Sequence, residues 1–313
     1  GSTAAQLLPA KWVRAARRLR TEHGELFVQL DKARYGGRVA CFQPQWRGQA
    51  TEYDIRSAYG ATLAGMLGRL PDCQLYPSRF DPLPEQPSWW DVTVRVDHPV
   101  APLPMRDTER DWQVHWPTSG EWRGWYTRLD LDQPGVEVVR VHQVHCGRYG
   151  GDLEAPVSAL LELRETAGPW RRAVVRQLTV SLAGKLAERS GSWRLWAPAA
   201  AERAKLPKGL VQLGGMDSMV MAYPVVEEPK AHNQPGISSY LTARVRIKLA
   251  DALRAAPGAI YCDTDSIHLP SDAAPPAGIG SSPGDWAQKG SGDAYYRGVR
   301  SYRLGGKVVG VPE

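Results

Sequence analysis

The chain has 313 residues, of which 42% are hydrophobic, 9% aromatic and 23% charged. This composition predicts a globular protein of one large or two modest domains, and it excludes a disordered tail, a disulfide-stapled small protein and a fibrous repeat. The formal net charge is +6, and residues 1–50, with nine basic and three acidic side chains, carry all of it. A basic end on a neutral body indicates a polyanionic partner, although a solvated basic helix explains it equally well.

No run of about 18 apolar residues occurs, so no membrane partner is expected. Four scattered cysteines without a CxxC pair predict reduced thiols in a cytoplasmic protein. His142, His145 and Cys146 are of metal-ligand type, but no second ligand group lies nearby in sequence, which disfavours a structural zinc site.

Helix-like and strand-like patterns alternate irregularly, which predicts an α+β fold. In the first part of the chain we expect an Arg-rich helix over Leu7–His23, strands over Leu26–Leu30 and Arg38–Phe42, and a strand over Ala50–Asp54 that leads into a helix over Ser57–Leu70. The middle part is expected to form strands over 89–98 and 136–144, followed by a helical hairpin over Leu153–Glu188 that is broken at Gly168-Pro169. The last part is expected to form a β-rich insertion over 191–235, a helix over Ile237–Ala255 and a hairpin over Ala259–Leu269.

The last hairpin has two carboxylates at its tip, Asp263 and Asp265. Residues i and i+2 of a strand face the same side of the sheet. Two carboxylates placed in this way repel each other unless a cation lies beside them. Mg²⁺ prefers oxygen ligands and leaves room for phosphate oxygens, so the pattern favours a magnesium site. A structural turn is the alternative.

A third carboxylate, Asp54, lies where a strand leads into a helix. If it converges with the hairpin tip, the carboxylates bind a pair of metal ions suited to in-line phosphoryl transfer. A helix N-cap is the simpler explanation for Asp54 alone.

Basic side chains gather on the helical hairpin. Arg172 and Arg176 share a face of its second helix, and Arg164 lies across the break. Guanidinium groups bind phosphate oxygens in a bidentate manner, so this face suits a triphosphate. By itself, the segment is more typical of a solvated Arg-rich helix.

These segments resemble, in this order, the motifs of family B DNA polymerases, most closely those of the protein-primed phage and plasmid branch. Tyr261-Cys-Asp-Thr-Asp-Ser266 matches YxDTDS of motif C, and Asp54-Ile-Arg-Ser-Ala-Tyr59-Gly60 resembles DxxSLYP of motif A. Three more segments are similar to family motifs: Arg176–Lys185 to motif B, Tyr35-Gly-Gly to the YxGG segment, and Arg300-Ser-Tyr302 to KxY.

The resemblance implies a role for each matched residue. Asp54, Asp263 and Asp265 are the catalytic carboxylates, and Asp54, Asp265 and the carbonyl of Ile55 bind two Mg²⁺ ions, for which Mn²⁺ is a substitute. Tyr59 stacks under the deoxyribose and excludes a 2′-hydroxyl. The other residues assigned to the incoming dNTP are Arg164, Arg172, Arg176 and Lys185. Those assigned to primer and template are Tyr35, Gly36, Gly37, Ser57, Thr264, Ser266, Arg300 and Tyr302.

The resemblance also implies an architecture: a palm with an antiparallel sheet and packed helices, helical-hairpin fingers and β-rich insertions. The expected segments are a basic helical segment (1–34), the palm with motif A (35–70), a palm continuation and insertion resembling the region that binds a terminal priming protein (71–152), the fingers (153–190), the β-rich insertion (191–235), and the palm with motif C and RxY (236–313). A proofreading exonuclease and a thumb are not expected in this chain.

The chain departs from motif B at Val180 and Ala183, where the family has Asn and Tyr. The main hypothesis is a template-directed DNA polymerase from a bacterial, phage or plasmid context, with primer-template DNA, dNTPs, a terminal priming protein and other replication proteins as partners. The alternatives are a nucleic-acid-binding or assembly module whose polymerase activity is weak or lost, and an initiating polymerase that is primer-independent or protein-primed.

Overall fold

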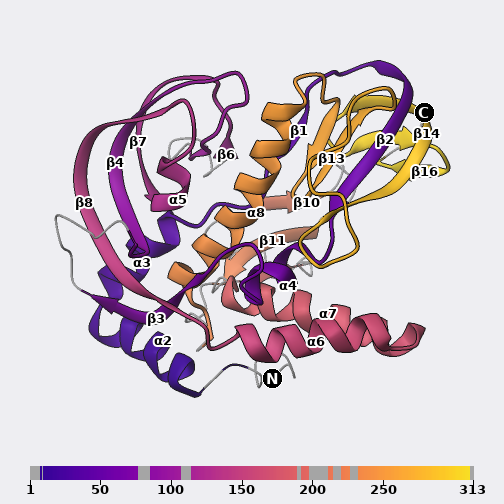
Figure 1. Cartoon of the computed structure of the whole chain (residues 1–313). Helices are drawn as coiled ribbons and strands as arrows, with labels where there is room; N and C mark the ends of the chain where they lie inside the picture. The colour runs from indigo at the N-terminus through magenta and orange to yellow at the C-terminus, as the bar shows by residue number, and fades with distance from the viewer. Residues whose placement is uncertain are drawn as a thin grey trace, which may run out of the picture.

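The computed structural model describes residues 8, 10–76, 85–106, 114–188, 192–196, 211–213, 220–225 and 232–310. Within these residues, helices and antiparallel sheets alternate along the chain (Figure 1). The α+β class is therefore confirmed. None of the described helices is long and apolar enough to cross a membrane.

The largest sheet has seven strands in the order β1-β12-β13-β2-β14-β15-β16. Their bounds are β1 Val39–Cys41, β2 Trp46–Ile55, β12 Tyr261–Asp263, β13 Ser266–Pro270, β14 Trp286–Gly298, β15 Ser301–Leu304 and β16 Lys307–Val309. β2 lies at the centre and pairs with β13 on one side and β14 on the other. Residues about 210 positions apart thereby become neighbours in one sheet.

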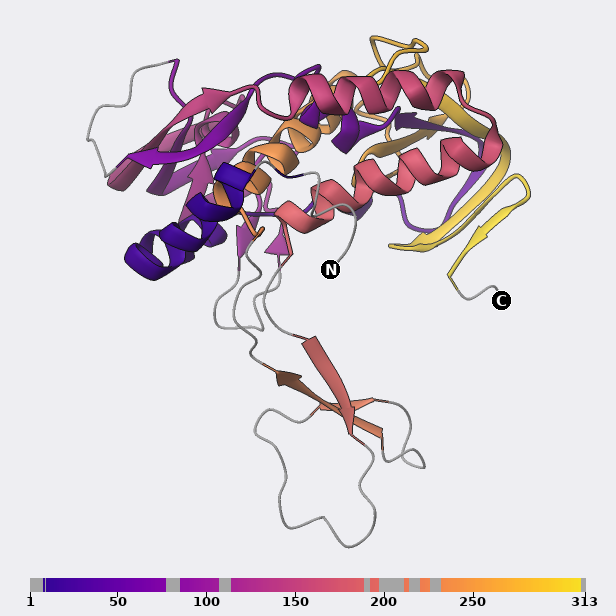
Figure 2. The ribbon, with the colours of Figure 1, turned by 90° about the horizontal axis from the view of Figure 1, so that it is seen from below.

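A second sheet has the order β3-β8-β4-β7. It is built from β3 Leu70–Tyr76, β4 Ser88–Asp97, β7 Ser119–Thr127 and β8 Val136–Gly150, with helix α5 (Arg128–Leu131) after β7. The described residues also form two small sheets. One pairs β5 Met105–Arg106 with β6 Val114–His115. The other, seen in Figure 2, is built from β9 Ser192–Trp196, β10 Val211–Leu213 and β11 Val220–Val225.

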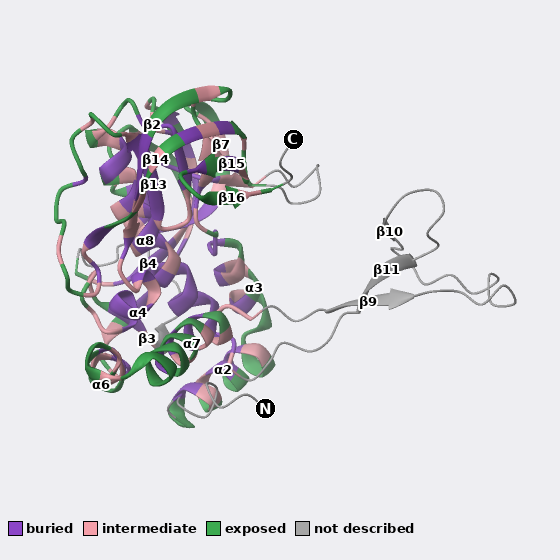
Figure 3. Cartoon of the chain, turned by 90° about the vertical axis from the view of Figure 1, so that its right-hand side faces the viewer, coloured by how far each residue is buried: buried purple, intermediate pink, exposed green. Residues whose placement is uncertain are grey.

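Helix α8 (Pro235–Ala255) lies between the two large sheets (Figure 1). It has buried residues on every side, as expected of a central helix, and Figure 3 shows the buried residues concentrated along it and the neighbouring strands. Helix α4 (Ala58–Leu63) follows β2 and contacts α8 as well as the helical pair α6 (Glu154–Thr166) and α7 (Pro169–Leu186). α4 therefore connects the seven-stranded sheet to that pair.

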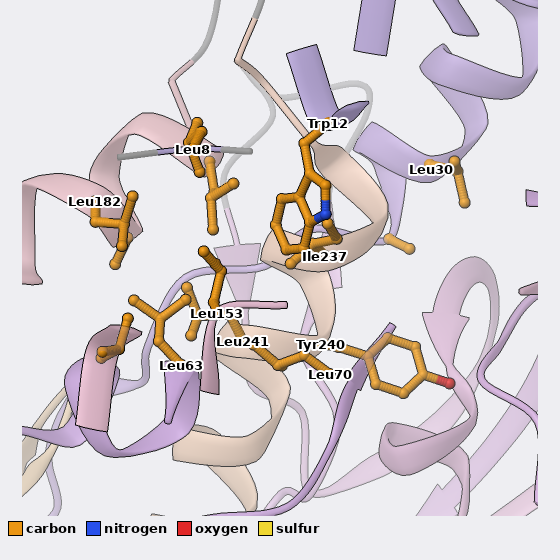
Figure 4. Close-up of a cluster of buried hydrophobic side chains, with 14 of the residues drawn as sticks. Leu8, Trp12, Leu30, Leu63, Leu70, Leu153, Leu182, Ile237, Tyr240 and Leu241 are labelled. Atoms are coloured by element: carbon orange, nitrogen blue, oxygen red, sulfur yellow. The ribbon is translucent and has the colours of Figure 1, made fainter. Parts of the chain in front are cut away.

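The N-terminal helices α2 (Ala10–Glu22) and α3 (Gly24–Lys32) pack against the same body. Trp12 of α2, Leu30 of α3, Leu182 of α7 and Tyr240 of α8 belong to one buried apolar cluster (Figure 4). Burial of a large apolar side chain contributes about 1.5–3 kcal/mol, so this cluster fixes the basic segment to the molecule.

Most of the expected elements are confirmed, including the helical hairpin that breaks at Gly168, the helix over Ile237–Ala255 and the final hairpin. The strand predicted over Leu26–Leu30 is wrong, because this stretch lies in α3, which buries Phe27 and Leu30 one helical turn apart. The helix predicted over Ser57–Leu70 ends at Leu63, because Gly65 and Gly68 take positive φ angles. Most of the 191–235 insertion lies outside the described residues, but its described stretches 192–196, 211–213 and 220–225 are strands.

Candidate active site

Asp54 and Asp265 come together because β2 and β13 are neighbours. Asp54 lies opposite Ser266 in the register of these strands, and the amide of Ile55 donates a 2.9 Å hydrogen bond to the carbonyl oxygen of Asp265. The motif A and motif C segments therefore bring Asp54 and Asp265 together at the adjoining ends of two inner strands, β2 and β13.

The turn between β12 and β13 is held by its own side chains. Thr264 has a positive φ of 60°, and its amide donates to the carbonyl oxygen of Arg38 at 2.7 Å. The Thr264 hydroxyl donates to Oδ1 of Asp263 at 3.0 Å, and the Ser266 hydroxyl donates to the carbonyl oxygen of Asp263 at 3.1 Å. Ser266 is buried and helps to hold the turn, while its predicted contact with DNA stays a prediction.

The two carboxylates destabilise each other's charge. Burial, followed by the charge of Asp54, raises the pKa of Asp265 to about 7. Burial also raises the pKa of Asp54, and the ammonium of Lys289, 3.8 Å from its Oδ1, opposes that shift. At neutral pH a carboxylate pair of this kind attracts a cation, since a nearby positive charge favours both ionised forms.

Asp263 has a different environment. The Tyr261 hydroxyl lies 3.3 Å from its Oδ2, and the Nε of Arg300 lies 3.6 Å from the same oxygen. With Thr264 on its other oxygen, Asp263 is already bound by the protein. Asp54 and Asp265 are therefore the pair that a cation could approach, with Asp263 beside it, and metal binding by this pair stays a prediction.

The donor set fits magnesium, which binds through one or two carboxylates and takes its remaining ligands from water and phosphate. Among the residues that the structure describes, no group of three or more His, Cys, Asp and Glu side chains has the arrangement of a metal site. A site here therefore relies on two carboxylates, with the carbonyl of Ile55 as the predicted backbone ligand. His145 and Cys146 are buried in β8, where His145 bonds to Gln29 at 2.6 Å.

Tyr59 lies near enough to Asp265 and Asp263 for their charges to act on its hydroxyl. Burial, with the charge of Asp265 next in size, raises its pKa to about 12. Its ring packs against two buried apolar clusters, the one that contains Leu182 and a second one that contains Ile55 and Trp286, and this packing fixes its position. The next residue is Gly60, which packs closely against α6. A Cβ at this position would lie 3.2 Å from Cδ2 of Leu161, which is a tight contact.

The hairpin α6–α7 brings two of its basic residues to this site. Arg164 donates to the hydroxyl of Ser57, which takes a positive φ of 49° just before α4. Arg176 is exposed on α7, and its charge lowers the pKa of Asp54. Both placements agree with the predicted phosphate-binding face.

The other two basic residues predicted to contact the nucleotide, Arg172 and Lys185, have partners within the protein. Arg172 donates to the carbonyl oxygen of Glu165 at 3.5 Å, across the turn of the hairpin, and Lys185 pairs with Glu188 at 2.8 Å. Val180 is 51% exposed and Ala183 is buried, so an apolar residue occupies the exposed motif B position that departs from the family.

The Tyr35-Gly36-Gly37 segment crosses beside the motif C turn. A Cβ on Gly37 would lie 2.7 Å from Cα of Thr264, so only glycine permits this approach, whereas Gly36 is exposed with open space around it. Tyr35 is 2% exposed and stacks on Tyr126 at 5.5 Å. The buried ring supports the segment, and the predicted contact of Tyr35 with template stays a prediction.

Arg300 and Tyr302 lie at the β14–β15 turn. Arg300 takes a positive φ of 53°, and its side chain is 67% exposed beside Asp263. The ring of Tyr302 is 9% exposed within a cluster of aromatic rings that includes Tyr261 and Tyr296. Arg300 is therefore exposed to a ligand, whereas the Tyr302 ring packs against Tyr261 of the carboxylate-bearing hairpin. The contacts predicted between these two residues and primer stay predictions.

Two contributors were missed by the sequence analysis. Lys289 lies beside Asp54, and a glycine after it, in a strand, was the available sign of an irregularity. Arg246 of α8 donates to the carbonyl oxygen of Tyr35 at 2.7 Å and pairs with Asp130. No local pattern marks Arg246, because its partners lie more than 100 residues away.

Neither a protein-family model nor a curated protein sequence matches this chain. Its fold is similar to solved structures of phi29 DNA polymerase. The orthorhombic form has a TM-score of 0.69 and 15% identity, with 99% of this chain and 58% of that chain covered. The complex with primer-template DNA and incoming nucleotides has a TM-score of 0.69, 16% identity, and coverage of 100% and 58%. For the complex with single-stranded DNA the values are 0.67, 15%, 96% and 54%. The chain thus spans little more than half the length of these polymerases, and the likeness establishes a DNA polymerase-like fold.

Proposed function

We propose that the chain is a template-directed DNA polymerase that adds dNTPs to a 3′-hydroxyl. The observation that carries this proposal is the convergence of Asp54 and Asp265 at the adjoining ends of β2 and β13. The charge of Arg176 acts on Asp54, and the charge of Asp265 acts on Tyr59. The solved complexes of phi29 DNA polymerase with primer-template DNA and incoming nucleotides support the same class of ligand for this fold.

In this proposal, Asp54, Asp265 and the carbonyl of Ile55 hold the divalent ions. Divalent ions held by these residues would supply the positive charge that activates the 3′-hydroxyl and neutralises the departing pyrophosphate. Arg164 and Arg176 orient the triphosphate through charge-assisted hydrogen bonds. Asp263, bound by Thr264 and near Arg300, fixes the hairpin turn on which Asp265 depends.

The same proposal assigns the subdomains. The seven-stranded sheet with α4 and α8 corresponds to the palm, and α6–α7 correspond to the fingers. The β3-β8-β4-β7 sheet lies in the 71–152 segment assigned to the terminal-protein region, and β9–β11 lie in the second insertion.

One extension assay tests the proposal. Primed and unprimed templates are supplied with Mg²⁺ and either dNTPs or NTPs, and product length is read on a denaturing gel. Extension of the DNA primer by dNTPs supports the proposal. Product from the unprimed template selects the initiating polymerase instead.

Loss of activity on an intact DNA-binding fold is the second candidate function. It is favoured by Val180, an exposed apolar residue where the family has a polar one. Salt-dependent DNA binding without any nucleotide incorporation selects it.

The Tyr59→Ala variant is expected to incorporate ribonucleotides at least about 10-fold more readily relative to deoxyribonucleotides, because removal of the ring opens space next to the carboxylates. Single-turnover incorporation of dCTP and CTP on the same primer measures this ratio. Tyr53→Ala is the control, since Tyr53 precedes the carboxylate on β2. An unchanged ratio in Tyr59→Ala would remove the steric role from Tyr59.

Replacing Arg14, Arg17, Arg18 and Arg20 by Gln is expected to weaken DNA binding. Helix α2 buries Trp12, Ala16 and Leu19 against the body, while Arg14, Arg17 and Arg18 are exposed. The logarithm of the affinity falls with the logarithm of the salt concentration, and each arginine that neutralises a phosphate makes this slope steeper by about 0.9. The variant should therefore show a flatter slope. Fluorescence anisotropy of labelled DNA at several salt concentrations measures it.

The control is a charge change of equal size elsewhere. Arg14→Gln with Arg17→Gln is compared with Arg95→Gln and Arg140→Gln, which lie on the exposed surface of β4 and β8. Equal salt slopes in the two double variants would return α2 to a solvated helix with no role in binding.

A further inference from the structure

The pairing of β14 with β2 is interrupted at one place next to the carboxylates. Ala287 lies opposite Asp54 and Gln288 opposite Tyr53, but the next paired residue is Gly290, opposite Glu52. Lys289 is therefore the extra residue of a β-bulge. A bulge redirects a side chain, and bulges are common beside active sites.

The bulge directs a cation to the carboxylates. The Nζ of Lys289 lies 3.8 Å from Oδ1 of Asp54, and the side chains of Lys289 and Asp54 are 48% and 28% exposed. Its charge lowers the pKa of both Asp54 and Asp265, against the effect of burial.

The other nearby lysine is committed elsewhere. Lys307 donates to both carboxylate oxygens of Glu52, at 2.8 and 2.9 Å. The charge of Arg176 acts on Asp54 less strongly than that of Lys289 does. Lys289 is therefore the principal cation acting on Asp54 in this structure.

We propose that Lys289 is the resident counter-ion of the Asp54–Asp265 pair and that it competes with divalent cations for this pair. An ammonium group and a divalent cation repel each other when both lie within a few ångströms of the same carboxylates. Because the lysine is half exposed, it gives way into solvent as the cation binds. The affinity of the site for the cation is thereby set below that of the carboxylate pair alone. This inference rests on the proposed function only in taking the pair as a metal site.

Direct binding of Mn²⁺ tests the proposal without an activity measurement. Free Mn²⁺ is titrated by electron paramagnetic resonance at pH 8, above the pKa of about 7 of Asp265. In the whole chain carrying Lys289→Met, the Kd for Mn²⁺ should fall about 3- to 10-fold, because the competing charge is removed. Lys289→Arg, which keeps the charge, should bind as the unchanged chain does. Lys32→Met, on the exposed face of α3, is the control for net charge and should also leave the Kd unchanged.

The outcomes separate this inference from the proposed function. Asp265→Asn identifies binding at the pair. If Asp265→Asn abolishes the Mn²⁺ site while Lys289→Met leaves the Kd unchanged or raises it, the counter-ion role is overturned and the metal site stands. If Asp265→Asn binds Mn²⁺ as well as the unchanged chain does, both the metal site and the counter-ion role are overturned. Circular dichroism checks that Lys289→Met is folded, and Lys289→Gln repeats the measurement with a polar side chain.

Discussion

The Asp265→Asn variant is expected to lose at least about 10³-fold in the rate of dNTP incorporation, because each factor of ten corresponds to about 1.4 kcal/mol and a metal site contributes several kcal/mol to the barrier. The substitution preserves the size of the side chain and removes its charge. Asp54 remains as a single carboxylate, which is a poor site for a pair of divalent ions. Single-turnover extension of a labelled primer with saturating Mg²⁺ measures the rate.

The same variant makes an opposite prediction for stability. Asp265 and Asp54 raise each other's proton affinity, so removing one charge relieves repulsion in the metal-free chain. Thermal unfolding at pH 8 without divalent ions should therefore show an unchanged or higher Tm. Inactivity together with raised stability cannot be explained by misfolding.

The control is Asp272→Asn, an exposed carboxylate just after β13. It should retain both the rate and the Tm of the unchanged chain. Wild-type extension by Asp265→Asn would remove Asp265 from the catalytic centre and, with it, the metal-binding role of the pair.

The success of the sequence analysis at this site has a local cause. Ala259–Leu269 consists of two short apolar segments around a polar tip, so this local pattern predicts the hairpin and its acidic turn. The break at Gly168-Pro169 is equally local, because proline starts a helix well and continues one poorly. The encounter of Asp54 with Asp265 depends instead on strand pairing over more than 200 residues, and it was reached through the resemblance to a family.

The errors have physical reasons as well. Leu26–Leu30 is apolar and short, and such runs do not distinguish a strand from a buried helix. In the structure, Phe27 and Leu30 both face the core, which a helix permits and a strand does not. Burial of Tyr35 and Tyr302 also escaped prediction, since a motif gives the position of a residue along the chain and not its depth in the fold.

The Asp130→Asn variant is expected to destabilise the protein by about 3–5 kcal/mol, because it leaves a buried guanidinium without its counter-charge. The side chains of Arg246 and Asp130 are 4% and 2% exposed, and they lie 2.7 Å apart. Asp130 also forms a capping box with Thr127, whose hydroxyl bonds to its other oxygen at 2.7 Å. Urea unfolding followed by circular dichroism measures the loss.

The matched control is Asp132→Asn, at the end of the same short helix. Asp132 pairs with Arg128 at 2.7 Å, but these side chains are 53% and 37% exposed. An exposed pair contributes about 0–1 kcal/mol, so Asp132→Asn should unfold nearly as the unchanged chain does. Replacing Asp130 and Arg246 together by Leu and Met should recover part of the stability, because no buried charge is left.

The position of this pair gives its loss a functional consequence. Arg246 donates to the carbonyl oxygens of Tyr35 and Gly36 at 2.7 and 3.4 Å, so it holds the segment that packs against the motif C turn. Asp130 belongs to the β3-β8-β4-β7 unit, whereas Arg246 belongs to the central helix. Asp130→Asn should therefore loosen the Gly36–Gly37 approach to Thr264 and weaken DNA binding in proportion to its loss of stability. If the variant unfolds at the same urea concentration as Asp132→Asn, the buried pair does not stabilise the contact between the β3-β8-β4-β7 unit and the central helix.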